Sequence, residues 1–499
     1  MLRLIFLVFI LKSIKYGTFM KKIAIVSLAT LFLAGCAATD GQSPLSSLTN
    51  SLTPDSKISK FDVVLASGNL AEAKEIALDE ADYDEEDNAL DDQFWGMQSA
   101  SIYRFEKDYE ASNRYFDLIE DVMYREDTEG MITNVSETLT SSLTNDTFLD
   151  YEQSVYDSIM VNTYKALNFT AMGDLQNARV EWNRSDDRQR RAADYFAERI
   201  NEKREEQEEE AKKELEENEA ASDVEVNESL SKADELLAEQ NIDMSQWTAY
   251  DGYVNPFSTF MHGLFFMLNA QDSSDVSKAV DSFKRVSNMT DTKVATDTLA
   301  LAQNINNGNT SIDSITNIWV VFENGEMAKK EEFRIDLPVF IASDNVNYAG
   351  VALPKIQEQM DHFGHVSVNG HTSEVIADMD RIIKAEFKEE WPLILTREIT
   401  RSVVKTVVQK QVNDRNMWLG IAAGVLQAVT TQADTRTWSV LPKNFQALML
   451  ENDGSGQVTI ESPGFGQALS VSVDPTKKNI IYVKAINSTL APSVEVISI

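Results

Sequence analysis

The hydrophobic pattern of this chain of 499 residues changes its period once, near Ser311, and this change limits the possible folds more than any other feature. Residues 57–310 contain no run of strictly alternating apolar side chains and only one proline, Pro256, which predicts helices. Beyond Ser311, short apolar runs separated by Gly, Pro and Asp predict strands. We therefore expect an α+β protein in which an N-terminal α-helical region (57–310) is followed by a C-terminal mixed α/β domain (311–499).

Within the C-terminal domain the pattern predicts two helices and a series of strands. Asn324-Gly325 is typical of a hairpin turn, so the first two strands are expected to pair with each other. The helices are expected over residues 375–387 and from Pro392 to about residue 412. The strands are expected at 318–322, 332–337, 348–353, 445–450, 457–461, 469–473, 480–486 and 494–499. The apolar residues 417–430 are too few to span a bilayer and are expected to form a buried helix.

Four segments of the helical region have the residue spacing of a close helical hairpin. Gly173, Leu175, Ala178 and Trp182 resemble the second half of a tetratricopeptide repeat (TPR), and weaker copies centre on the small residues Ala73, Ser112 and Ala279. The small residues lie 39, 66 and 101 positions apart, so the region is either an interrupted TPR-like stack or a set of separate hairpins in a helical bundle. A highly charged stretch, residues 197–229, is expected to be an inserted solvated helix or a disordered arm.

The amino terminus carries the signals of an exported lipoprotein. Lys21 and Lys22 precede an apolar run at residues 23–32, and Leu-Ala-Gly-Cys36 then resembles the bacterial lipobox. Residues 1–35 are therefore predicted to be a signal peptide, with Met20 as the true start. The alternative is that Cys36 is an ordinary buried thiol.

The lipobox resemblance implies the fate of the mature chain. Cys36 would carry diacylglycerol on its sulfur and palmitate or a similar acyl group on its new amine, and these chains would anchor the protein stably. Ala37 stands where the family's inner-membrane retention signal has Asp, which implies the outer membrane, facing the periplasm. The Ser-, Thr- and Gly-containing residues 36–56 would form a flexible tether.

Composition excludes several functions. The chain has 45 Lys and Arg against 80 Asp and Glu, a net charge of −35, so nucleic acid is not an expected partner. A single cysteine allows neither an internal disulfide nor a cysteine-based zinc site. We find no Walker loop, Rossmann glycine set, zinc-protease motif or Gly-x-Ser-x-Gly elbow. We therefore predict no cofactor and no enzymatic activity.

Two clusters deserve weighing as sites. His362, His365 and His371 fall within ten positions and are weak candidates for a zinc or copper site, against a surface loop as the alternative. The second cluster is a candidate partner-binding face, because Trp and Arg are favoured at interfaces. It consists of Trp182, Arg184, Asp187, Arg188 and Arg191. Its alternative is simple pairing along a helix, such as Asp187 with Arg191.

Four stretches together resemble a poorly characterised family of Gram-negative outer-membrane lipoproteins with TPR-like helices. The stretches are residues 181–191 (EWNRSDDRQRR), 253–265 (YVNPFSTFMHGLF), 323–337 (ENGEMAKKEEFRIDL) and 433–442 (ADTRTWSVLP), joined by Ala377-Asp-Met-Asp380. The resemblance implies no catalytic residues. It also suggests a link to the machinery of peptidoglycan synthesis, because the family is often encoded near lipoprotein activators of peptidoglycan synthases.

These observations lead to one main hypothesis and two alternatives. The main hypothesis is a lipid-anchored periplasmic scaffold or adaptor whose helical hairpins bind a protein or peptide partner in the cell envelope. The first alternative is a cell-wall hydrolase or ligand-binding enzyme that uses carboxylates of the C-terminal domain. The second is an accessory lipoprotein of a secretion or appendage apparatus.

Overall fold

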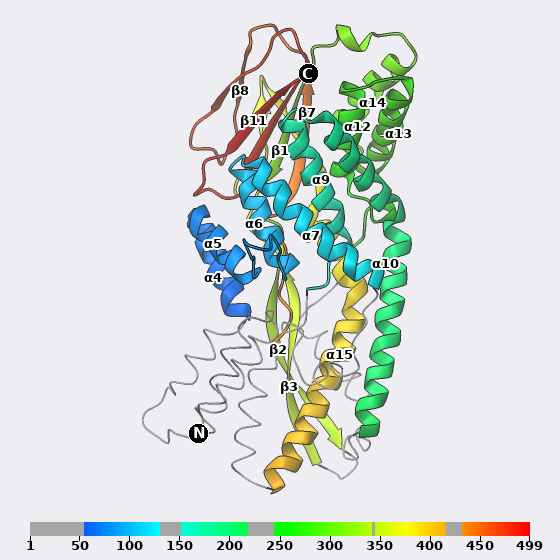
Figure 1. The fold of residues 1–499 in the computed structure, drawn as a ribbon, viewed down its shortest axis with the longest axis vertical. Helices are drawn as coiled ribbons and strands as arrows, with labels where there is room; N and C mark the ends of the chain where they lie inside the picture. The colour runs from blue at the N-terminus through cyan, green and yellow to red at the C-terminus, as the bar shows by residue number, and fades with distance from the viewer. Residues whose placement is uncertain (1–53, 130–150, 218–243, 342–344, 416–431) are drawn as a thin grey trace.

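The computed structural model describes residues 54–129, 151–217, 244–341, 345–415 and 432–499. Helices make up the first part of these residues and most strands follow (Figure 1). The helices before the sheet are α4 (Pro54–Ala66), α5 (Leu70–Glu80), α6 (Gln93–Phe105), α7 (Tyr109–Glu129), α9 (Val155–Ala171), α10 (Leu175–Glu217), α12 (Pro256–Leu268), α13 (Ser273–Thr290) and α14 (Lys293–Asn306). Of two single-turn 3₁₀ helices, η2 (Asp251–Tyr253) lies between α10 and α12, and η3 (Ile312–Ser314) lies between α14 and the first strand.

Consecutive helices pack as antiparallel hairpins whose turns were foreseen in part from the sequence. Gly68 and Gly173 adopt left-handed φ angles of 81° and 76° between their helices, which only glycine adopts without strain. At the turn between α6 and α7, Lys107 takes the same conformation with φ 68°. The small residues Ala73, Ser112, Ala178 and Ala279 are each 0% exposed, because the paired helices approach closely there. Helical hairpins are thus present, and their regular stacking as TPR repeats stays a prediction.

A five-stranded sheet forms the second layer, in the order β11-β10-β1-β7-β6. Its strands are β1 (Ile318–Asn324), β6 (Glu374–Asp378), β7 (Asn444–Leu450), β10 (Asn479–Ala485) and β11 (Ser493–Ser498). Strand β1 lies at the centre, parallel to β10 and antiparallel to β7. The prediction of a hairpin at Asn324-Gly325 is wrong, because β1 pairs with strands far along the chain and not with the strand that follows it.

The two faces of the sheet contact different layers. Alternate side chains of the central strands, such as Trp319 and Val321, join the large core that the helices form. The intervening side chains, such as Val320 and Phe322, pack against a small β layer. That layer is built from β4 (Ser367–Val368), β5 (His371–Thr372), β8 (Gln457–Ile460) and β9 (Leu469–Ser472). The helical region and the sheet therefore share one continuous core.

A long arm extends from this body. Strands β2 (Lys329–Ile341) and β3 (Asn345–Gln357) pair only with each other among the described strands, and α15 (Met379–Arg415) packs along β3. Figure 1 shows the hairpin, α15 and the end of α10 running side by side away from the sheet. The expected helix at 375–387 begins later, because Glu374–Asp378 pairs with β7, and Pro392 lies inside α15 instead of starting a second helix.

Residues 197–217 of the charged stretch are helical, as one of the two expected alternatives has it, and they continue α10, which is one helix through Glu217, instead of forming a separate insert. The remainder of that stretch, the apolar residues 417–430, Cys36 and the signal peptide lie outside the described residues. In the described parts of the chain, no helix combines the length and apolar character needed to cross a membrane.

The close contact between α12 and α13 gives a first test of the fold. A Cβ atom added at Gly263 would lie 2.9 Å from the ring of Phe283, which is fully buried. Gly263→Val should therefore reduce the free energy of unfolding by about 1–3 kcal/mol, as overpacking does in other cores. Chemical denaturation measures this change. Gly466→Val is the control, because nothing lies within 4 Å of the added Cβ there; equal stability of the two variants would contradict the packing described.

Candidate functional site

A charged pocket opens between α10, α12, α13, the η2 turn and the start of α15, with a volume of about 830 Å³. We call it the α10–α13 pocket. Two of the stretches singled out in the sequence contribute to it: Asp186, Gln189 and Arg190 come from residues 181–191, and His262 comes from residues 253–265. Arg381, the residue after a third stretch, also lines it. Helix α13 supplies the facing wall. The pocket therefore lies where the helical layer meets the C-terminal region.

The inner wall of the pocket is polar and largely buried. His262 is 3% exposed, and its Nδ1 lies 2.9 Å from the hydroxyl of Ser282. Burial lowers the pKa of His262 to about 4, so the imidazole is neutral at pH 7. The Oε1 atom of Gln189 accepts hydrogen bonds from the backbone N–H of Asn255 and the hydroxyl of Thr259. The buried Nε2 of Gln189 has no partner among the described residues, so a hydrogen-bond donor is left unused at this wall.

An arginine pair and one carboxylate form the next part of the lining. Asp186 lies 2.8 Å from Arg285 and 2.8 Å from Arg190. Burial alone would raise the pKa of Asp186, but the interaction with His262, the hydrogen bond from Arg285 and the charges of the two arginines outweigh it and lower the pKa. The carboxylate is therefore ionised at neutral pH. One negative charge is shared between two guanidinium groups, so the trio keeps a net positive charge.

Two further cations have no carboxylate within ion-pair distance among the described residues. The ammonium group of Lys278 lies 4.6 Å above the ring of Phe266. Arg381 donates to the backbone carbonyls of Thr248 and Ala249 and stacks on Tyr250, 4.0 Å from the ring centre. The lining thus holds four cationic side chains against the three carboxylates Asp186, Asp251 and Asp281. The net charge of the lining is therefore positive, whereas the net charge of the whole chain is −35.

The predicted partner-binding residues of α10 do not share one face. Trp182 is 1% exposed and packs toward Phe265, which corrects its assignment to a binding surface: it is a core residue. Asp187 and Arg191 form an exposed i,i+4 ion pair of 2.6 Å, as the alternative interpretation expects. Arg184 and Arg188 point to a different neighbour from the pocket residues Asp186, Gln189 and Arg190.

That neighbour is the network around Lys165, a buried lysine that was not predicted from the sequence. The ammonium group of Lys165 lies within ion-pair distance of Asp117, Glu120 and Glu181, and its side chain is 2% exposed. Arg184 and Arg188 complete this network by pairing with Glu181 and Glu120. The signal in the sequence is that Lys165 is the only basic residue of α9. The network joins α7, α9 and α10 and is structural.

The histidine cluster lies on the far side of the sheet, around the β4–β5 hairpin. Asp361 closes the preceding turn by accepting from the backbone N–H groups of Phe363 and Gly364. Across the described ranges, no three His, Cys, Asp or Glu side chains are placed to hold a metal ion. His362, His365 and His371 therefore gain no support as ligands from the geometry.

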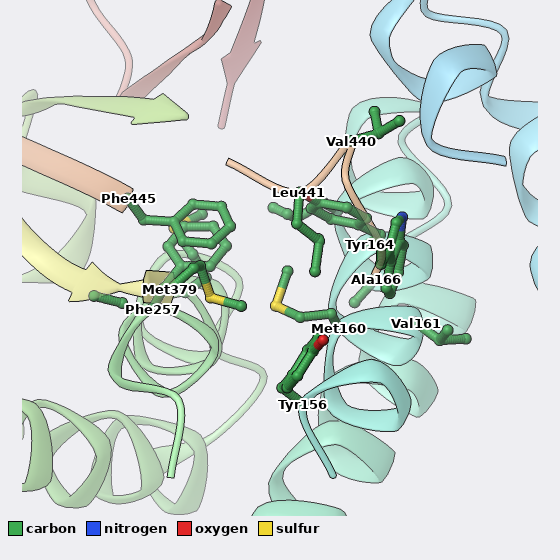
Figure 2. Packing of buried hydrophobic residues seen from close by; sticks show 14 of the residues in the cluster. Tyr156, Met160, Val161, Tyr164, Ala166, Phe257, Met379, Val440, Leu441 and Phe445 are labelled. Atoms are coloured by element: carbon green, nitrogen blue, oxygen red, sulfur yellow. The ribbon is translucent and has the colours of Figure 1, made fainter. Parts of the chain in front are cut away.

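Residues 433–442 occupy the inner side of the helical layer. Trp438 is fully buried, its Nε1 donates to Ser101 of α6, and its ring packs near Tyr164 of α9 and Phe116 of α7. Gln98 holds the backbone on both sides, donating to the carbonyl of Thr437 and accepting from the N–H of Val440. Figure 2 shows Leu441 of this segment directed toward Met160 of α9. A stretch of the chain itself thus fills the groove that these hairpins form.

A group of buried carboxyl groups lies where α15 meets α9. Glu386 is 4% exposed and accepts the backbone N–H groups of Val155 and Tyr156 at the start of α9. Burial, reinforced by Glu390 and Asp157, raises the pKa of Glu386 to about 8, and burial raises the pKa of Asp157 to about 6. Such shifts occur at catalytic sites and also in structural networks. Here the carboxyl group is enclosed and bonds the end of a helix.

Comparisons with protein-family models, curated proteins and solved structures found no match to this chain. The resemblance to outer-membrane lipoproteins therefore stays a prediction from the sequence. The candidate site rests on its own geometry.

The buried carboxyl group of Glu386 predicts a specific pH dependence. Because its pKa is higher in the folded state than the value near 4.5 expected when unfolded, its contribution to stability declines as pH rises from about 4.5 to about 8. Glu386→Gln should remove this decline, so the variant should lose less stability than the wild type between pH 5 and pH 8.5. The difference should reach a few kcal/mol at most, at about 1.4 kcal/mol per pKa unit.

Denaturant unfolding at a series of pH values measures this difference. Glu389→Gln, at an exposed position of the same helix, is the matched control and should keep the wild-type slope. If Glu386→Gln also follows the wild-type slope, the carboxyl group does not titrate as described.

Proposed function

We propose that this protein is a lipid-anchored adaptor of the cell envelope that binds a protein or peptide partner through its helical layer. The observation that carries the proposal is the α10–α13 pocket, a preformed concavity of about 830 Å³ with fixed cations and hydrogen-bonding groups. Gln189, His262 and Ser282 are held by buried contacts, so the lining is organised before any partner binds. The lipobox at Cys36 supplies the anchor in this proposal.

In this proposal, the helical layer on the sheet binds the partner, and a tether connects the folded body to the membrane. Helices α6, α7 and α9 contact residues 433–442 of the chain itself, so this side of the helical layer is already occupied. The α10–α13 pocket is the concave surface on the helical layer that supports the proposal. The TPR-like character of the hairpins and their place in the envelope belong to the same proposal.

The lipid anchor has a direct test. Intact-mass measurement of the membrane-fraction protein should show a chain that begins at Cys36 and carries the additional mass of acyl chains. Cys36→Ser should lose all acyl mass, because serine offers no thiol for diacylglycerol. Ser43→Ala, in the same segment, should keep it. A mature wild-type chain that starts at another residue would refute the anchor.

The binding role is tested by photo-crosslinking in cells. A photoreactive residue at Asn288, on the exposed rim of the pocket, should give discrete adducts with an envelope protein. The same residue at Val63, 70% exposed on α4 and outside the pocket, is the matched control and should not give those adducts. Identical adducts at the two positions, or none at Asn288, would count against the pocket as a binding site.

A further inference from the structure

We propose that the α10–α13 pocket recognises an acidic peptide segment in extended conformation, with separate carboxylates meeting Lys278 and Arg285. This inference deepens the proposed adaptor function and rests on it for the nature of the partner. The sign of the lining charge is its first support. Lys278 and Arg381 have no carboxylate partner among the described residues, and Arg190 and Arg285 share the single carboxylate of Asp186.

The unused hydrogen-bond donor is the second, independent support. Gln189 is 1% exposed and lines the pocket, and its Nε2 has no partner in the described structure. An unsatisfied buried donor is unfavourable, so an oxygen atom that reaches and accepts from it is stabilised. An amide N–H₂ group can only donate, which selects a ligand with acceptor oxygens. Carboxylates and peptide carbonyls both provide them.

The spacing of the cations favours a peptide over one compact anion. Lys278 and Arg285 lie seven residues apart on α13, about 10 Å along the helix axis at roughly 1.5 Å per residue. An extended peptide in the polyproline II conformation has three residues per turn and advances about 3.1 Å per residue, so acidic residues three positions apart lie on one face about 9 Å apart and match this distance. A phosphate group is instead bound by cations that converge on one point. The carboxylates Asp251 and Asp281 on the lining also oppose a densely charged anion.

The experiment uses the full-length protein purified in detergent and a fluorescent peptide of the pattern Glu-Ala-Ala-Glu-Ala-Ala-Glu. Fluorescence anisotropy should show saturable binding that weakens at least tenfold when each Glu is replaced by Gln, and that weakens as NaCl rises. Lys278→Glu should weaken binding at least tenfold. Lys284→Glu, an equal charge change at an exposed position of α13 outside the pocket, should change it by less than twofold.

Three results would overturn the inference. One is equal binding of the Glu and Gln peptides, and another is equal weakening by Lys278→Glu and Lys284→Glu. The third is binding to vesicles of phosphatidylethanolamine and phosphatidylglycerol that depends on Lys278 while the peptide does not bind, which would assign the pocket to lipid headgroups. Adducts at Asn288 in cells together with no acidic-peptide binding would reject only this inference. Peptide binding without adducts would reject the adaptor role and leave the pocket chemistry standing.

Discussion

The insertion of residues 433–442 between the helices and the sheet is the contact on which the rest of the structure depends. Trp438 lies against Tyr164 and Phe116, and Gln98 bonds the backbone on both sides of it. The segment leads directly into β7, where Phe445 stacks on Phe257 of α12 with ring centres 3.7 Å apart. One short stretch therefore fixes the helical hairpins, the sheet and α12 relative to one another. Because α12 also forms a wall of the α10–α13 pocket, the shape of the pocket depends on this contact.

The acidic composition explains how charges are arranged inside the molecule. Several buried carboxylates are matched with cations, as in the pair of Arg104 with Glu323, 2.8 Å apart, where both side chains are almost fully buried. Lys165 among its three carboxylates follows the same rule. A buried charge without a partner is strongly unfavourable, so these basic side chains pair with carboxylates inside the protein. Lys278 and Arg381, which have no carboxylate partner in the described structure, stand apart from this pattern.

Local patterns predicted the elements of the fold better than their partners. The change of period near Ser311 falls between α14, which ends at Asn306, and β1, which begins at Ile318. The pairing of β1 with β7 and β10 could not be predicted, because it joins residues more than 100 positions apart. Likewise, the spacing of Val375, Ile376 and Met379 suits a helix, but pairing with β7 makes the first residues a strand. Tertiary contacts overrule local preference there.

The same limit applies to the candidate site. The stretch 181–191 lies partly on the pocket, but its sequence does not reveal which face of α10 meets α12 and α13. The face that does so carries Asp186, Gln189 and Arg190, spaced three and four residues apart. The positive charge of the α10–α13 pocket contrasts with the acidic composition of the whole chain. At physiological salt the Debye length is about 8 Å, shorter than the roughly 10 Å between Lys278 and Arg285, so each cation acts on its own neighbourhood. Because its charges are screened beyond this length, a locally positive pocket on an acidic protein attracts anions only over short distances, which favours recognition by contact over long-range steering.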